Sequence, residues 1–271
     1  MDSYINLMSG TVSRVAAVLV APFIGSFLGV LILRLPEGRP IVTGRSACDQ
    51  CGHRLGTRDL VPFLSYLLAH GRCRYCGAPI GLFPVAAETA AVCVAAWAAA
   101  VADGPDIWLA CLLGWTLLTA AWIDLRTMIL PDVLTLPLLL TGLAVTAAID
   151  PDALADRALA AALAYVVLFG TARVYRRLRG RDGLGLGDAK LLAALGAWLG
   201  LSSLPIVLVL ASCAGLAAAG VAMLLGKRVT AATAIPFGPC LAAAGWLAWL
   251  YADWINAWLD SDPVVLNFGA S

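Results

Sequence analysis

Long apolar segments recur along almost all of this 271-residue chain and constrain its fold more than any other feature. A helix that crosses a membrane needs about 20 mainly apolar residues. Windows of this kind lie at 13–33, 84–102, 107–123, 131–149, 153–174, 186–201, 204–225 and 233–259. The chain is 61% apolar and 13% charged, whereas a soluble domain is about half apolar and a quarter charged. We therefore predict an all-α polytopic membrane protein with about eight transmembrane helices, of which the sixth is short.

The basic residues alternate between the breaks that separate these windows. All of the 18 Lys and Arg residues except Arg14 and Arg157 fall in alternate breaks, which lie on one side of the membrane in this topology. Because cytoplasmic loops carry an excess of Lys and Arg, we expect this side to be cytoplasmic and both termini to face outward. The formal net charge of +1 gives no indication of a nucleic-acid partner.

A polar segment between the first two windows suggests a small extramembrane domain. We predict three parts: a first transmembrane helix in residues 1–33, a small cytoplasmic domain at 34–83, and a seven-helix transmembrane domain at 84–271. Within the polar part, Leu60–Leu68 is markedly apolar. We expect this stretch to lie on the membrane surface, to pack on the spans, or to form a small core helix.

Four of the eight cysteines form two Cys-x2-Cys pairs in the polar domain. The pairs are Cys48/Cys51 and Cys73/Cys76, separated by 21 residues and each followed by a glycine. Two such hairpins can supply four thiolates to a structural Zn2+ ion, and the glycine eases the tight turn. The alternative is two disulfides, which rarely persist in the reducing cytosol. His53 or His70 could replace a cysteine ligand, although each is more simply a solvated side chain, so we predict a four-cysteine zinc site.

Two aspartates stand at the edges of apolar windows, where an ionisable residue is costly and indicates a functional site. Asp124 ends the third window, and Asp188 follows Gly185 and Gly187 at the start of the sixth. Glycine has no Cβ and allows a close backbone path there. Both carboxylates lie at the cytoplasmic boundary in the predicted topology. Taken singly, each could be a boundary charge, and Asp188 could be one that the helix dipole favours.

Two carboxylates that are held close together cannot both ionise easily, so they share a proton. The protonated partner can donate to a carbonyl oxygen, while the ionised partner takes a proton from the water that attacks the carbonyl carbon. We therefore predict an aspartic endopeptidase in which Asp124 and Asp188 form the catalytic pair. Two alternatives stay open: a transporter whose carboxylates carry protons or cations, and a zinc-knuckle scaffold without catalysis.

Other charged residues near the pair have simpler interpretations. Arg126 could pair with the first aspartate, and Asp132 follows Pro131 as a charge at a helix start. Lys190 lies two residues beyond the second aspartate, so on a helix it should point largely away from that side chain. We expect its long side chain to reach the membrane surface.

These motifs resemble those of the bacterial type IV prepilin peptidases, a GxGD-type family of bifunctional leader peptidase/N-methyltransferases. The resemblance covers nearly the whole chain. It rests on Gly25–Leu28 with Arg34–Pro36, both Cys-x2-Cys pairs, Asp59–Tyr66, Gly71–Gly77, Asp124 with Leu130–Asp132, and Gly185–Asp188 with Lys190.

The resemblance implies that Asp124 and Asp188 are catalytic, with Gly185, Gly187 and Lys190 in support. It implies cleavage of the basic leader of a prepilin or pseudopilin, a single apolar helix in the lipid, at the cytoplasmic face of the inner membrane. N-methylation of the new terminus with S-adenosylmethionine is expected to follow. The family associates the cysteine loop with zinc and with the methyltransferase form.

Glu88 lies just inside the second window, one residue further from Pro84 than in the commonest family pattern. We predict that it binds the substrate amine or S-adenosylmethionine; the alternative is a charge at a helix boundary. Gly29, Leu33 and Phe83 also depart from the family pattern, near the parts that the family links with methyl transfer.

Overall fold

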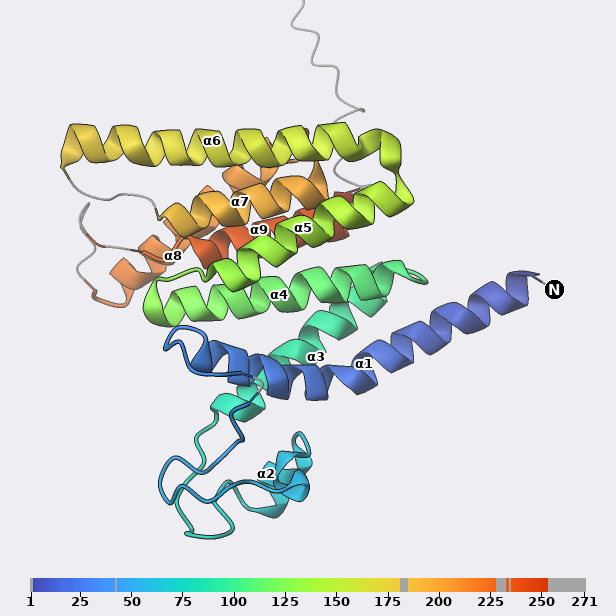
Figure 1. The fold of residues 1–271 in the computed structure, drawn as a ribbon, viewed down its shortest axis with the longest axis vertical. Helices are drawn as coiled ribbons and strands as arrows, with labels where there is room; N and C mark the ends of the chain where they lie inside the picture. The colour runs from blue at the N-terminus through green and yellow to red at the C-terminus, as the bar shows by residue number, and fades with distance from the viewer. Residues whose placement is uncertain (1, 42, 181–184, 228–232, 234, 253–271) are drawn as a thin grey trace, which may run out of the picture.

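The described part of the computed structural model, residues 2–41, 43–180, 185–227, 233 and 235–252, is built from helices without strands (Figure 1). The long helices are α1 (Asp2–Arg34), α3 (Phe83–Val101), α4 (Asp106–Thr127), α5 (Asp132–Ile149), α6 (Leu154–Arg179), α7 (Leu186–Leu199), α8 (Leu204–Leu224) and α9 (Gly238–Leu250). A short helix, α2 (Leu64–Leu68), and 3-10 turns at Thr57–Leu60 and Pro151–Ala153 complete the described helices.

The prediction of an all-α membrane protein is confirmed, and every predicted window coincides with a helix. Among the described residues, six helices are long and apolar enough to cross a membrane: α1, α3, α4, α5, α6 and α8. The other two, α7 with 14 residues and α9 with 13, are about 20 Å long and fall short of the roughly 30 Å hydrocarbon core. The last predicted window continues to 259, but its final residues lie outside the described part.

Helix α7 lies inside the bundle, where it packs against α5, α6 and α9 (Figure 1). All of its side chains from Asp188 to Leu199 are buried except that of Lys190. A helix that is apolar on every side is stable only when neighbours surround it. At its C-terminal end, Trp198 donates a buried hydrogen bond of 2.8 Å to the carbonyl oxygen of Leu138 on α5. The bundle therefore fixes α7 firmly and with it the position of Asp188.

A second core joins α1, α3 and α4, and small residues make it close-packed. Its buried members include Ala17, Ala21, Ala91, Ala95 and Ala98. At Gly25, α1 and α3 are so close that a Cβ atom on this residue would lie 2.6 Å from the Cα atom of Glu88. Small residues at such contacts let membrane helices approach each other closely.

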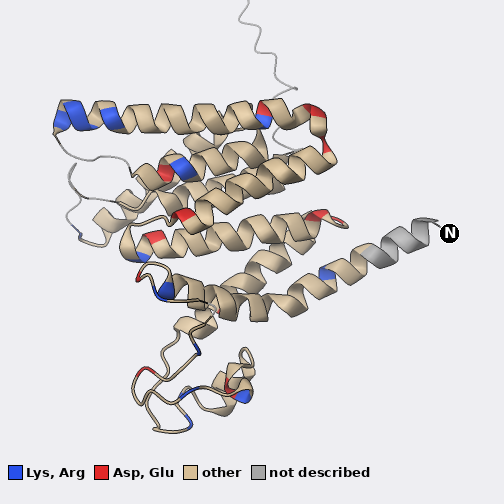
Figure 2. Ribbon diagram, in the orientation of Figure 1, with Lys and Arg blue, Asp and Glu red and all other residues tan. Residues whose placement is uncertain are grey.

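Charged residues are distributed unequally between the two ends of the bundle (Figure 2). The last turn of α6 carries Arg176, Arg177 and Arg179, whereas its first turn carries Asp156. Acidic residues at the C-terminal end of α4 and at the N-terminal ends of α5 and α7 lie at the same end of the bundle as these arginines (Figure 2). The ends of α4 and α7 that carry Asp124 and Asp188 therefore lie at the basic end of the bundle.

Candidate active site

Asp124 lies in the last turn of α4, with only 6% of its surface exposed. Its Oδ2 atom accepts a hydrogen bond of 3.1 Å from the backbone N–H of Gly238, the first residue of α9. The fit is close, because a Cβ atom at position 238 would lie 2.7 Å from the same oxygen. Helix α4 ends three residues later, where Met128 adopts the left-handed conformation. Asp124 is thus held by α9 rather than directed into open water.

Asp188 is the third residue of α7 and is 7% exposed. Its Oδ2 atom accepts a hydrogen bond of 3.2 Å from the backbone N–H of Gly185, the residue that precedes the helix. This contact satisfies one of the amide groups left free at a helix start, where the helix dipole also favours a carboxylate. The interaction expected of a simple helix-start charge is therefore present, but it engages only one carboxylate oxygen.

The two aspartates border the same small region at the basic end of the bundle. Their carboxylates are close enough to interact electrostatically. Leu130, in the connection between α4 and α5, packs against Gly187, the neighbour of Asp188, and against Gly238, which binds Asp124. Cβ atoms at these two glycines would lie 2.7 Å from Leu130 Cβ and 3.2 Å from Leu130 Cδ1, respectively. The Cys240 thiol on α9 is also within electrostatic reach of both acids. The structure therefore brings together the two acids that the sequence singled out.

Lys190 does not simply extend to the surface. Its Nζ atom forms an ion pair of 2.6 Å with Oδ1 of Asp132, the first residue of α5. The pair ties the start of α5 to the start of α7, beside the connection that carries Leu130. Arg126, which we expected as a possible partner of the first aspartate, instead lies over the ring of Phe83, with 5.3 Å from its guanidinium carbon to the ring centre.

This arrangement suits acid–base chemistry on a carbonyl group. Each carboxylate has one oxygen fixed by a backbone N–H, and within the described residues no hydrogen bond occupies its Oδ1 atom. Two buried acids that interact electrostatically can share a proton, which is the charge state that this chemistry uses. The catalytic roles of Asp124 and Asp188, and the supporting roles of Gly185, Gly187 and Lys190, stay predictions.

Sequence reasoning missed Gly238 and gave Leu130 no role beyond its place in the family motif. One signal was present: Pro236 and Pro239 flank Phe237 and Gly238 near the start of the last predicted window, and a proline in the first turn marks a helix start. No pattern in the sequence indicates which carboxylate the amide of Gly238 binds.

The four cysteines of the polar domain form one cluster. Their Sγ atoms all lie within 4.8 Å of one another, and Cys48 Sγ and Cys76 Sγ are 3.9 Å apart. Zn–S bonds of 2.3 Å in a tetrahedron place two sulfurs about 3.8 Å apart, so the cluster has the size that zinc requires. All four are free thiols, which contradicts the alternative of two disulfides. The cluster can hold a metal ion.

The local backbone explains why the two pairs adopt the same shape. In each knuckle a glycine after the second cysteine has a positive φ, 68° at Gly52 and 72° at Gly77, and donates to the carbonyl oxygen of the first cysteine. Backbone N–H groups of Cys51 and Gln50 lower the pKa of the Cys48 thiol to about 7. His53 lies outside the cluster and stacks on Tyr75 at 3.6 Å.

Glu88 connects the cysteine domain to the transmembrane bundle. It is 5% exposed on α3, and its Oε2 atom accepts a hydrogen bond of 2.8 Å from the backbone N–H of Phe63, just before α2. Ser26 on α1 lies near its carboxylate. This carboxylate is thus more than a charge at a helix boundary, and its role in binding a substrate or cofactor stays a prediction.

Comparisons with known proteins agree with this geometry. Residues 111–220 match the type IV leader peptidase family, and residues 19–102 match the bacterial peptidase A24 N-terminal domain. A prepilin leader peptidase/N-methyltransferase of Aeromonas hydrophila is 40% identical, over 87% of this chain and 89% of the relative. The chain belongs to the type IV leader peptidase family. A protein of the same description from Pseudomonas aeruginosa is 36% identical over 88% of this chain and 90% of its own length. No solved structure matches the chain.

The match to the N-terminal domain ends just after α3, and the match to the leader peptidase family begins within α4. The matched leader peptidase region contains both aspartates and ends within α8, so the α9 residue Gly238, which binds Asp124, lies beyond it. The N-terminal region contains the cysteine cluster and Glu88. Our division into residues 1–33, 34–83 and 84–271 stays a prediction.

Proposed function

We propose that this chain is a membrane endopeptidase that removes the leader peptide of a type IV prepilin or pseudopilin and then methylates the new amino terminus. The observation that carries the proposal is the pair of buried carboxylates, Asp124 and Asp188, at one end of a membrane bundle of the leader peptidase family. Relatives named for both activities cover most of the chain, which supports the combined function.

In this mechanism the two aspartates act as one acid–base unit. The ionised carboxylate accepts a proton from water while the oxygen of that water forms a bond to the scissile carbonyl carbon, and the protonated carboxyl donates to the carbonyl oxygen. When the tetrahedral intermediate collapses, the C–N bond breaks, the leaving amine takes a proton from one carboxyl, and a hydroxyl group of the intermediate returns a proton to the other carboxylate. The hydrogen bonds from Gly238 and Gly185 hold the two side chains in place throughout.

S-adenosylmethionine would supply the methyl group to the released amine. The thiolates of Cys48, Cys51, Cys73 and Cys76 would hold a zinc ion, for which the spacing of their sulfur atoms is suitable. Four thiolates close the coordination shell of zinc, so the ion would have a structural role and would fasten the two knuckles together.

The basic end of the bundle supports a cytoplasmic active site in a bacterial inner membrane. A substrate with a single apolar helix would lie in the lipid, with its Lys- and Arg-rich leader at this end. Both acids lie at that end rather than near mid-membrane, which favours the peptidase over the transporter alternative.

The test uses purified chain, a prepilin and S-adenosylmethionine, with the mass of the product as readout. We expect loss of the leader mass and gain of a methyl group with the wild type, and neither with Asp124→Asn or Asp188→Asn. Asparagine still accepts a hydrogen bond, so both variants should fold. Asp103→Asn is the control, since this exposed acid pairs with Arg14 away from the site. Leader cleavage by either active-site variant would overturn the mechanism.

A further inference from the structure

The cysteine domain exposes a group of leucines around α2. Leu64, Leu67 and Leu68 are 52%, 68% and 65% exposed, and their spacing of three and four residues places them on one face of the helix. Leu60, in the turn before α2, is 42% exposed, and this turn packs against α2. We call these four residues the leucine surface. A group of large apolar side chains of this kind marks a contact with another apolar phase.

The orientation of α2 is fixed by an unusual turn. Phe63 has φ 56° and ψ −50°, and the N–H of Leu64 donates to the carbonyl oxygen of Pro62 at 2.5 Å, which closes a γ-turn. A residue in this region of φ/ψ space persists only where its surroundings hold it. Here Glu88 on α3 stabilises the turn, because its carboxylate accepts a hydrogen bond from the backbone N–H of Phe63. The leucine surface is therefore attached to a membrane helix and cannot rotate freely.

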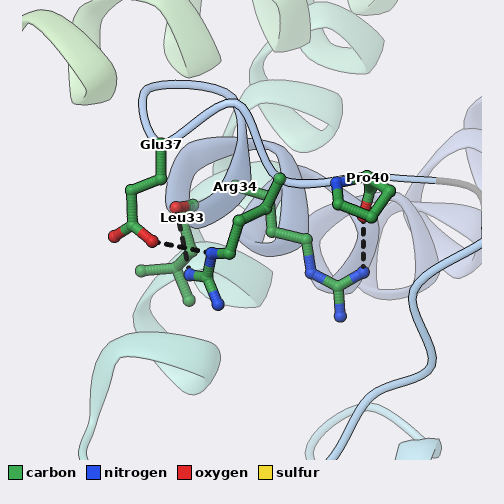
Figure 3. A network of polar contacts seen from close by, with 5 residues as sticks. Leu33, Arg34, Glu37 and Pro40 are labelled. Carbon is green, nitrogen blue, oxygen red and sulfur yellow. Dashed lines mark hydrogen bonds and ion pairs between the residues drawn. The ribbon is translucent and has the colours of Figure 1, made fainter.

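The other end of the domain is tied down as well. After α1 ends, the Arg34 guanidinium donates to the carbonyl oxygen of Gly44 at 2.6 Å and to that of Pro40 at 3.1 Å, so the connection folds back against the helix end. Figure 3 shows the bond to Pro40. Arg39 donates to the carbonyl oxygen of Leu33 and pairs with Glu37 in the same network (Figure 3).

The position of α2 indicates what contacts the leucine surface. Along the direction of the long helices, α2 lies beside the bundle at the level of the C-terminal part of α1, rather than beyond its end (Figure 1). That part of α1 belongs to a candidate membrane span. The exposed basic side chains of Arg58 and Arg72 flank α2 in the sequence and would suit the phosphates of lipid head groups.

We propose that the leucine surface lies in the membrane interface and anchors the cysteine domain flat against the bilayer on which the active site opens. The partner is the lipid surface: apolar side chains enter the boundary of the acyl chains, and the adjacent basic residues meet the head groups. This inference rests on exposure, attachment and position, and it holds independently of the proposed enzyme activity.

The test replaces Leu67 with the photoreactive residue benzoylphenylalanine in the full chain, reconstituted in nanodiscs of phosphatidylcholine and phosphatidylglycerol with tritiated acyl chains. Irradiation should transfer the label to the protein. The matched control carries the same replacement at Gln50, an exposed residue of the same domain outside the leucine surface, and should lose this labelling. A repeat at Leu64 should reproduce the result for Leu67.

Three outcomes would overturn the proposal. Equal labelling from positions 50 and 67 would mean that no particular face meets the bilayer. A product of twice the chain mass without lipid label would assign the surface to a second copy. A product with an added prepilin, again without lipid label, would assign it to the substrate helix.

Discussion

Gly187 leaves no room for a methyl group between the start of α7 and Leu130. A Cβ atom at position 187 would lie 2.7 Å from Leu130 Cβ, whereas carbon atoms in contact are about 3.5–4.0 Å apart. The Gly187→Ala substitution must therefore move the backbone beside Asp188, or the connection after Asp124, by about 1 Å. A displacement of this size at a catalytic group costs about 100-fold in rate, or about 2.7 kcal/mol of transition-state stabilisation.

The loss of stability should be similar to or smaller than this loss of transition-state stabilisation. Overpacking costs about 1–3 kcal/mol, and the better helix propensity of alanine returns up to about 1 kcal/mol. We therefore expect Gly187→Ala to fold, with a loss of about 0–3 kcal/mol, and to cleave the leader about 100-fold more slowly. Initial cleavage rates by mass spectrometry and the thermal unfolding midpoint measure the two effects.

Two further glycines complete a graded series. A Cβ atom at Gly185 would lie 3.2 Å from Asp188 Oδ2, so Gly185→Ala should have a smaller effect. Gly170 on α6 has no heavy atom within 4 Å of such a Cβ atom, and Gly170→Ala is the neutral control. Cleavage by Gly187→Ala at the rate of the Gly170→Ala control would refute the argument, as would a reversed order of Gly185 and Gly187.

Three more predictions follow from contacts around the site. Glu88→Ala leaves the buried N–H of Phe63 without its partner, which should cost about 1–3 kcal/mol and speed proteolysis within the cysteine domain. Cys51→Ser should abolish the binding of about one zinc ion per chain, measured by mass spectrometry of the metal, because zinc requires four ligands. Lys190→Asp replaces the ion pair between Lys190 and Asp132 with two neighbouring acids. A partly exposed ion pair contributes about 1 kcal/mol, so we expect cleavage to slow about fivefold.

Each of these predictions has a matched control. Glu88→Gln keeps an acceptor for the Phe63 amide, so equal protease sensitivity of the Gln and Ala variants would contradict the role of the hydrogen bond. Cys93→Ser changes a cysteine outside the cluster, and zinc loss there too would show that the assay reports unfolding. Combining Lys190→Asp with Asp132→Lys restores opposite charges and should recover most of the rate; a double variant as slow as the single one would count against the ion pair.

The sequence determined features whose physical basis is local. An apolar run of about 20 residues becomes a helix because the backbone hydrogen bonds must be satisfied within the segment in lipid. The four cysteines lie in two short hairpins with a glycine at the left-handed position, so their spacing was enough to predict the cluster. The positions of Asp124 and Asp188 near helix ends could also be predicted, because the point at which an apolar segment ends depends on the residues of that segment alone.

Only the tertiary structure decided which segments meet. The backbone N–H that donates a hydrogen bond to Asp124 belongs to Gly238, 114 residues away. The N–H that donates to Glu88 belongs to Phe63, 25 residues away. Arg126 likewise lies over the ring of Phe83 on α3, and Lys190 forms an ion pair with Asp132 on α5. Apolar helices in lipid carry no pattern that names their neighbour, since the choice depends on how small residues and side-chain shapes fit across the whole bundle.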